Sequence, residues 1–186
     1  NSLMKLIFDT HSHYDDERFD DCREDILDEI FSSNVGAVIS CAVDQFASYN
    51  ANKNIAEKYK NCYFTAGVHP LNMADNGPLN RSLLVAQASH PKCVAIGEIG
   101  LDYHYLKDNR DEQISLVKEQ ITVANELSLP ISFHDREAHE DTINILSELQ
   151  PKGVVHCFSG SNEMANEILK LGMYIGVGGV VTFNNA

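Results

Sequence analysis

The sequence predicts an α/β fold, a TIM (β/α)8-type barrel that ends after its seventh strand. Short, continuous apolar segments alternate with segments of helical periodicity along the 186 residues, which is typical of a parallel sheet covered on both faces. A barrel usually needs about 250 residues, so length alone favours an open, doubly wound sheet. Metal-ligating residues end four of the strands and favour the barrel, because strand ends converge on one mouth only when the sheet closes.

The expected strands are continuous in apolar character and rich in β-branched residues, as in strands buried on both faces. They are Leu6–Asp9, Ala37–Cys41, Cys62–Val68, Cys93–Glu98, Pro130–His134, Gly153–Cys157 and Tyr174–Val177.

The expected helices lie between these strands. The segment 111–128 is the clearest, since Ile114, Val117, Ile121 and Ala124 share one face and Pro130 follows its end. The others are Arg18–Ser33, Ser48–Tyr59, Glu137–Leu149 and Glu163–Leu171. No linker or low-complexity tract divides the chain, so we expect a single domain over residues 1–186 that lacks the last βα unit of a full barrel.

Composition and charge describe an acidic globular protein. Hydrophobic residues make up 44%, and no stretch is long and apolar enough for a transmembrane helix; nor is a signal peptide visible. Fourteen Lys and Arg against 27 Asp and Glu give a net charge of −13, which disfavours a general nucleic-acid binder. The five cysteines are widely spaced, which indicates reduced thiols and predicts a cytoplasmic location. They are Cys22, Cys41, Cys62, Cys93 and Cys157.

Residues that ligate divalent metals stand at the ends of four strands. The first strand leads into His11 and His13, the fourth ends at Glu98, the fifth at His134 and the sixth at His156. Side chains two apart on a strand project to the same side, about 6.5–7 Å apart, so His11 and His13 can face one ion. A closed barrel would bring all five side chains to one mouth.

Imidazole and carboxylate together suit Zn²⁺, Mn²⁺ or Fe²⁺, whereas sites made mostly of oxygen suit Mg²⁺. Five candidate ligands exceed the three that one catalytic zinc usually takes. We therefore expect two divalent ions bridged by Glu98, one held by His11 and His13 and the other by His134 and His156. Two such ions activate water for hydrolysis, most naturally of phosphate esters.

Six motifs, in this order along the chain, give it a specific resemblance to a known family. They are Asp9–His13, Gly67–Pro70, Gly97–Tyr103, His134–Ala138, His156–Gly160 and Gly178–Phe183. With this ordered set the chain resembles the TatD family of metal-dependent deoxyribonucleases, within the amidohydrolase-like barrel superfamily.

The resemblance implies a (β/α)8 barrel with two divalent ions, Mg²⁺, Mn²⁺ or Zn²⁺, bound by His11, His13, Glu98, His134 and His156. It implies Glu98 as the bridging ligand in water activation. Single-stranded DNA would be the substrate, hydrolysed at its phosphodiester bonds, often from the 3′ end. Family members also carry a further strand that ends in Glu-Thr-Asp, whose Asp is a metal ligand. We expect this strand to be missing here, which leaves the activity of this form open.

Three further residues are candidates for binding substrate. His69, before Pro70, could contact a phosphate or serve only in a loop. Arg136 suits a bidentate phosphate contact, or could instead form a salt bridge with Glu137 or Asp141. Asp102 could orient a ligand histidine or cap a loop.

Two other functions stay open. The first is hydrolysis of a small amide, lactone or phosphotriester, since related barrels support such reactions; those enzymes often use a carboxylated lysine as the bridge, so Glu98 favours the nuclease. The second is an inactive, truncated form that binds metal or pairs with a partner through an open edge. The sequence leaves the native metal, exonuclease versus endonuclease action, the pathway and the oligomeric state open.

Overall fold

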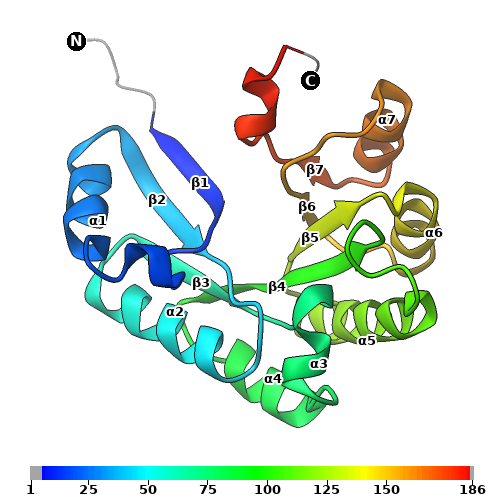
Figure 1. Cartoon of the computed structure of the whole chain (residues 1–186), viewed down its shortest axis with the longest axis horizontal. Helices are drawn as coiled ribbons and strands as arrows, with labels where there is room; N and C mark the ends of the chain where they lie inside the picture. The colour runs from blue at the N-terminus through cyan, green and yellow to red at the C-terminus, as the bar shows by residue number, and fades with distance from the viewer. Residues whose placement is uncertain (1–5, 185–186) are drawn as a thin grey trace.

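A curled, fully parallel sheet forms the frame of the protein in the computed structural model, which describes residues 6–184 (Figure 1). Its seven strands pair in sequence order from β1 to β7. They are β1 (Ile7–Ser12), β2 (Val35–Ser40), β3 (Cys62–Ala66), β4 (Cys93–Asp102), β5 (Ile131–Arg136), β6 (Gly153–Val155) and β7 (Tyr174–Ile175). All seven predicted strands are confirmed, and the sheet is an α/β barrel left open on one side.

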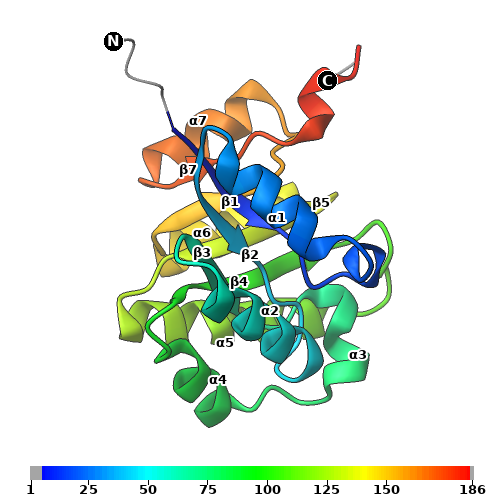
Figure 2. The same ribbon diagram turned by 90° about the vertical axis from the view of Figure 1, so that its left-hand side faces the viewer.

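The helices lie on the outer face of the curled sheet (Figures 1 and 2). They are α1 (Arg23–Ser32), α2 (Ala47–Lys58), α3 (Met73–Asn76), α4 (Arg81–Ala88), α5 (Arg110–Leu127), α6 (His139–Leu149) and α7 (Asn162–Lys170), with short 3-10 turns at Glu17–Phe19, Pro70–Asn72 and Gly179–Thr182. No helix within residues 6–184 combines the length and hydropathy needed to cross a bilayer.

The main corrections to the predicted elements concern three segments of the chain. The helix expected from Arg18 begins at Arg23, because Asp16 caps a separate 3-10 turn by accepting a hydrogen bond from the backbone N–H of Arg18. Two helices, α3 and α4, occupy the segment between β3 and β4, where none was predicted. Strand β4 continues to Asp102 instead of ending at Glu98.

The core lies between the sheet and its outer helices. Phe64 of β3, Ile96 of β4 and Phe133 of β5 are fully buried, as are Leu84 of α4 and Ile121 of α5. The middle strands are therefore held from behind by packed apolar side chains, and this fixes the positions of the polar side chains on their inner face.

The two outer strands are held much less firmly. Within the described residues, β1 pairs only with β2 and β7 only with β6, so the barrel has a gap between β1 and β7 (Figure 1). Apolar side chains stand exposed on both sides of it, including Phe8, Tyr174 and Val177.

Candidate metal centre

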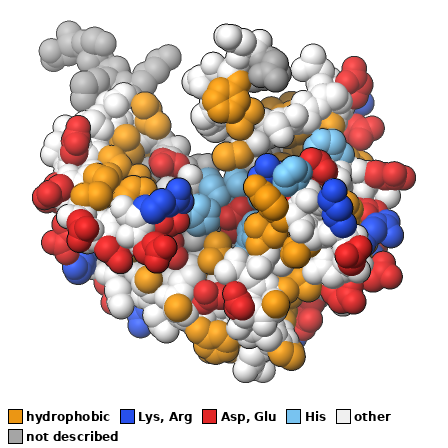
Figure 3. Space-filling model, in the orientation of Figure 1, with side chains coloured by type: hydrophobic (Ala, Val, Ile, Leu, Met, Phe, Trp, Pro, Cys, Tyr) orange, Lys and Arg blue, Asp and Glu red, His pale blue; other side chains and the backbone are white. Residues whose placement is uncertain are grey.

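Glu98 stands at the centre of a cluster of histidines inside the curled sheet. It lies in the middle of β4, only 4% exposed, and its backbone N–H donates to the carbonyl of Ala42 at 2.7 Å. Five imidazoles reach its carboxylate: His11 Nε2 (3.4 Å) and His13 Nε2 (3.0 Å) at Oε2, and His69 Nε2 (3.4 Å), His134 Nδ1 (3.2 Å) and His156 Nε2 (2.7 Å) at Oε1. Figure 3 shows histidines gathered in the hollow between the two sides of the molecule.

A glycine allows β4 and β5 to approach closely beside this cluster. Gly100 has a φ of 149°, and a Cβ there would lie 2.0 Å from the carbonyl oxygen of His134. Only glycine fits this conformation and this space. The close register that results pairs Gly100 with His134 and brings the His134 ring over Glu98.

His13 and His11 present nitrogens to one point in front of Glu98. The Nδ1 of His13 lies 3.0 Å from the carbonyl oxygen of Cys41, which can only accept, so Nδ1 carries a proton. The Nε2 of neutral His13 is then a lone pair facing both the carboxylate and the Nε2 of His11, 3.1 Å away. His11 is supported through its Nδ1 by the hydroxyl of Ser132 at 3.1 Å.

His134 is oriented in the same way by a buried carboxylate. Its Nε2 lies 3.0 Å from Oδ2 of Asp102, which is fully buried, so Nε2–H donates and Nδ1 faces Glu98 as a lone pair. A carboxylate that holds a histidine in this way is the usual support of a metal-ligating imidazole. The other oxygen of Asp102 accepts from the backbone N–H groups of His104 and Tyr105. Both roles considered for Asp102 are therefore present at once.

The cluster places hydrogen-bond acceptors against one another, and a proton or a metal ion between them resolves this. Neutral His13 and His134 would each direct a lone pair at an ionised carboxylate, so each must be protonated or must bind a metal ion. Burial lowers the pKa of each ring, but the hydrogen bond and charge of Glu98 outweigh it and raise the pKa above the ordinary value for both. Burial likewise opposes ionisation of Glu98, yet its histidine hydrogen bonds hold its pKa well below the ordinary value. The residues present thus fit a divalent ion.

His156 is ready to ligate as a neutral ring. Burial lowers its pKa to about 4, and its Nδ1 is buried with no hydrogen-bond partner in the described structure. The ring stacks on His11 at a centroid distance of 3.5 Å. His156 directly follows the last residue of β6. Its ring therefore links the His11 side of the cluster to the His134 side.

His69 differs from the others in the direction of its hydrogen bonds. Its Nδ1 accepts from the backbone N–H of Leu71 at 3.1 Å, so the neutral ring carries its proton on Nε2. This Nε2–H points at Glu98 as a donor. A donor suits contact with a phosphate oxygen better than coordination of a metal ion.

Two groups of side chains could hold a metal ion by geometry alone, each with its ligand atoms within 4.8 Å of one another. They are His11, His13 and Glu98, and His69, Glu98 and His134. The first matches the expected grouping. The second contains His69 where His156 was expected, and the proton on His69 Nε2 favours His156 as the ligand.

A broad cleft of about 1180 Å³ opens in front of the cluster. Arg136 lines it beside His69 and His134, and forms no ion pair within residues 6–184. The salt bridges considered for it do not form, because Glu137 pairs with His104 and Asp141 with Arg110. The guanidinium of Arg136 therefore remains available to a ligand in the cleft.

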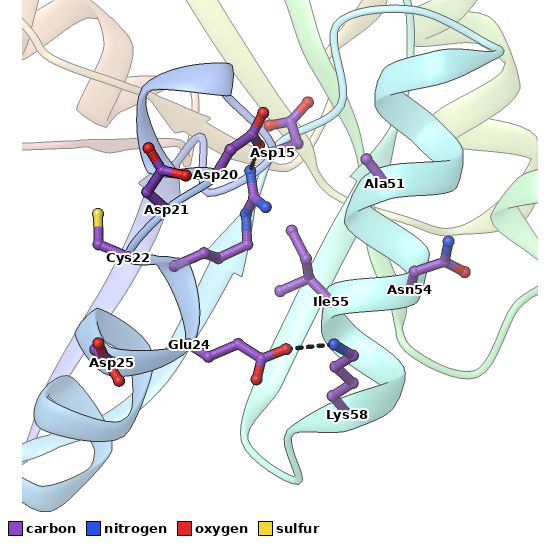
Figure 4. Close-up of a pocket in the computed structure, with 11 residues that line it drawn as sticks. Asp15, Asp20, Asp21, Cys22, Glu24, Asp25, Ala51, Asn54, Ile55 and Lys58 are labelled. Carbon is purple, nitrogen blue, oxygen red and sulfur yellow. Dashed lines mark hydrogen bonds and ion pairs between the residues drawn. The ribbon is translucent and has the colours of Figure 1, made fainter.

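A second groove shows where part of the protein's acidity lies. It runs between α1 and α2, and Asp20, Asp21, Glu24 and Asp25 line it opposite Lys58 (Figure 4). Lys58 Nζ and Glu24 Oε1 close across it at 2.6 Å. None of the five clustered histidines lines this groove, so these carboxylates belong to the outer surface.

The sequence analysis missed some supporting residues. Ser132 holds the ring of His11, and it could have been found, because it lies two residues before His134 and so shares its face of β5. The backbone carbonyl of Cys41, which fixes His13, carries no sequence signal of its own.

Comparison with known proteins identifies the family of the chain. The family model described as TatD related DNase matches residues 8–186. The chain belongs to the TatD family of metal-dependent hydrolases. The TatD-related protein YjjV of Escherichia coli K12 has a crystal structure that superposes with a TM-score of 0.86 at 33% identity, covering 99% of this chain and 72% of that one.

Two TatD family relatives illustrate the range of the family. The uncharacterized metal-dependent hydrolase YabD of Bacillus subtilis is 36% identical over 184 residues, which is 97% of this chain and 72% of YabD. The 3′-5′ ssDNA/RNA exonuclease TatD of Salmonella typhimurium is 32% identical over 178 residues, 94% of this chain and 68% of that protein.

Proposed function

We propose that this TatD family hydrolase cleaves phosphodiester bonds of single-stranded DNA, from the 3′ end, with two divalent ions held around Glu98. The observation that carries the proposal is the single buried carboxylate faced by the lone pairs of neutral His13 and His134 and by Nε2 of His11. A relative named as an exonuclease on single-stranded DNA and RNA supports the substrate class.

Each residue has a role that follows from its contacts. His11 and His13 would hold one ion and His134 and His156 the other, with Glu98 bridging them. When bound, such ions supply Lewis-acid activation of water near neutral pH and offset negative charge on the phosphate. Asp102 keeps the Nδ1 lone pair of His134 aimed inward.

Two side chains would orient the substrate. His69 presents an Nε2–H toward the centre of the site, where a phosphate oxygen can accept it. Arg136 presents an unpaired guanidinium at the rim, and guanidinium binds phosphate through two parallel hydrogen bonds. A few such contacts suffice for an exonuclease that grips one strand end, despite the net charge of −13.

The test is cleavage of a single-stranded oligonucleotide labelled at its 5′ end, incubated with Mg²⁺ or Mn²⁺. We expect shortening from the 3′ end that stops with EDTA and falls by at least about 100-fold in Glu98→Gln, since even residues that only support metal ligands cost about 10- to 100-fold. Glu167→Gln, an exposed change on α7, is the matched control and should cleave like the wild type.

Other outcomes would overturn the proposal. Turnover of small esters or lactones above that of oligonucleotides would assign a small-molecule hydrolase. Metal binding without turnover of any of these substrates would assign an inactive metal-binding form. If the proposal holds, the affinity for the oligonucleotide should fall as salt is added, because phosphate contacts release counterions. An affinity that does not change with salt would count against it.

A further inference from the structure

Arg136 rests against an exposed aromatic ring at the rim of the cleft. Its Cζ lies 4.8 Å from the centroid of the Tyr105 ring. Tyr105 is 60% exposed, and its ring also meets the ring of His104 edge-on at a centroid distance of 4.6 Å. A guanidinium over an aromatic face is attracted by the ring, and its N–H donors stay free to bond outward.

The carboxylates near Arg136 are already occupied by other groups. The carboxylates on either side of Arg136 in the sequence, and the nearby carboxylate on α6, each form an ion pair with another side chain. The pairs are Asp135 with His139 (2.6 Å), Glu137 with His104 (2.7 Å) and Asp141 with Arg110 (2.7 Å). Within residues 6–184, the side chain that the Arg136 guanidinium contacts is thus the ring of Tyr105.

The loop that carries Tyr105 is tied to the metal centre through one buried carboxylate. Asp102 Oδ1 accepts from the backbone N–H of Tyr105 at 2.9 Å, while Asp102 Oδ2 contacts His134 Nε2 at 3.0 Å. The β4–β5 register also pairs Asp102 with Arg136. The strands therefore set the position of the Arg136 backbone relative to the histidine cluster, and the guanidinium at the end of its side chain needs a further contact to be held in place.

From this geometry we propose that Tyr105 is a positioning residue, which holds the guanidinium of Arg136 at the rim so that it meets a phosphate of the bound strand. The inference rests on the proposed function, because it assigns how that site grips its substrate. Tyr105 itself acts through Arg136 and does not touch the reacting atoms.

The test combines cleavage kinetics with binding of a fluorescein-labelled single-stranded oligonucleotide in EDTA, measured by fluorescence anisotropy. We expect Tyr105→Ala to raise KM and the metal-free Kd roughly 2- to 5-fold, the range of an exposed cation–π contact, with kcat nearly unchanged. Tyr105→Phe keeps the ring and should behave like the wild type. Tyr174→Ala removes another exposed tyrosine, 72% exposed on β7, and is the matched control.

A double-mutant cycle decides whether Tyr105 acts through Arg136. We expect Tyr105→Ala to add nothing to Arg136→Ala, since the ring has no guanidinium left to hold. Additive losses, a Tyr105→Phe as weak as Tyr105→Ala, or a Tyr105→Ala equal to an active wild type would each overturn the inference and leave the proposed function standing. A wild-type chain that neither binds nor cleaves the oligonucleotide would overturn the proposed function, and the inference with it.

Discussion

The middle of the sheet and its two outer strands differ sharply in how they hold their side chains. Every residue of β4 except Val94 is buried, and Phe133 beside it on β5 is inaccessible to solvent. No residue of β1 is buried, and Tyr174 of β7 is 72% exposed. The candidate metal centre takes Glu98 and His134 from the firm region and His11 and His13 from the β1 side. The geometry of the centre therefore depends on how firmly β1 is held against the middle strands of the sheet.

The largest expected effect is on stability, and it contrasts two phenylalanines. Phe133→Ala removes a fully buried ring and should cost about 3–5 kcal/mol of unfolding free energy. Phe8→Ala removes a ring that is 64% exposed on β1 and should change it by about 0.5 kcal/mol or less. Urea unfolding followed by circular dichroism measures both. Equal losses would show that β1 is packed as firmly as the centre.

The next prediction compares the supports of two ligand histidines. Asp102→Asn removes the buried negative charge behind His134 and should lower metal affinity about 10- to 100-fold. Ser132→Ala removes only a neutral hydroxyl from His11, so its effect should be smaller. Calorimetric titration with Mn²⁺ gives both affinities. The reverse order would mean that the β1 side sets the strength of the centre.

The third prediction concerns the dependence of metal affinity on pH. The pKa values of His13 and His134 are both raised by Glu98, so a metal ion must displace protons from them. Apparent metal affinity should therefore fall as the pH falls through these raised values, by roughly tenfold per pH unit for each displaced proton. Metal titrations between about pH 6 and about pH 8 would show it. An affinity independent of pH would exclude protonated histidines in the metal-free centre.

The same contrast explains what the sequence could predict. Continuous apolar runs such as Ala37–Cys41 predicted the strands. The histidines near the carboxyl ends of β1, β5 and β6 predicted that their side chains meet at one mouth. The predicted end of β4 at Glu98 was wrong, because Gly100 and Asp102 beyond it are residue types common in loops, although the inner face of a curled sheet accepts such residues.

Other features depend on contacts that local sequence does not carry. Helices α3 and α4 were missed because Pro70, Gly77 and Pro78 interrupt their region; Asn80, which caps α4 through the backbone N–H of Leu83, was the available signal. The direction of the His69 proton and the free guanidinium of Arg136 depend on which neighbours are already paired, and only the folded arrangement shows that.

The cluster around Glu98 joins parts of the chain that are distant in sequence, from His11 near its beginning to His156 in its last quarter. An ion bound there would act as a reversible cross-link across almost the whole chain. By mass action, a ligand at about 100 times its Kd stabilises the folded state by about 2.7 kcal/mol. Thermal unfolding should therefore report the metal content of a preparation, so that a chelated sample melts at a lower temperature than a loaded one.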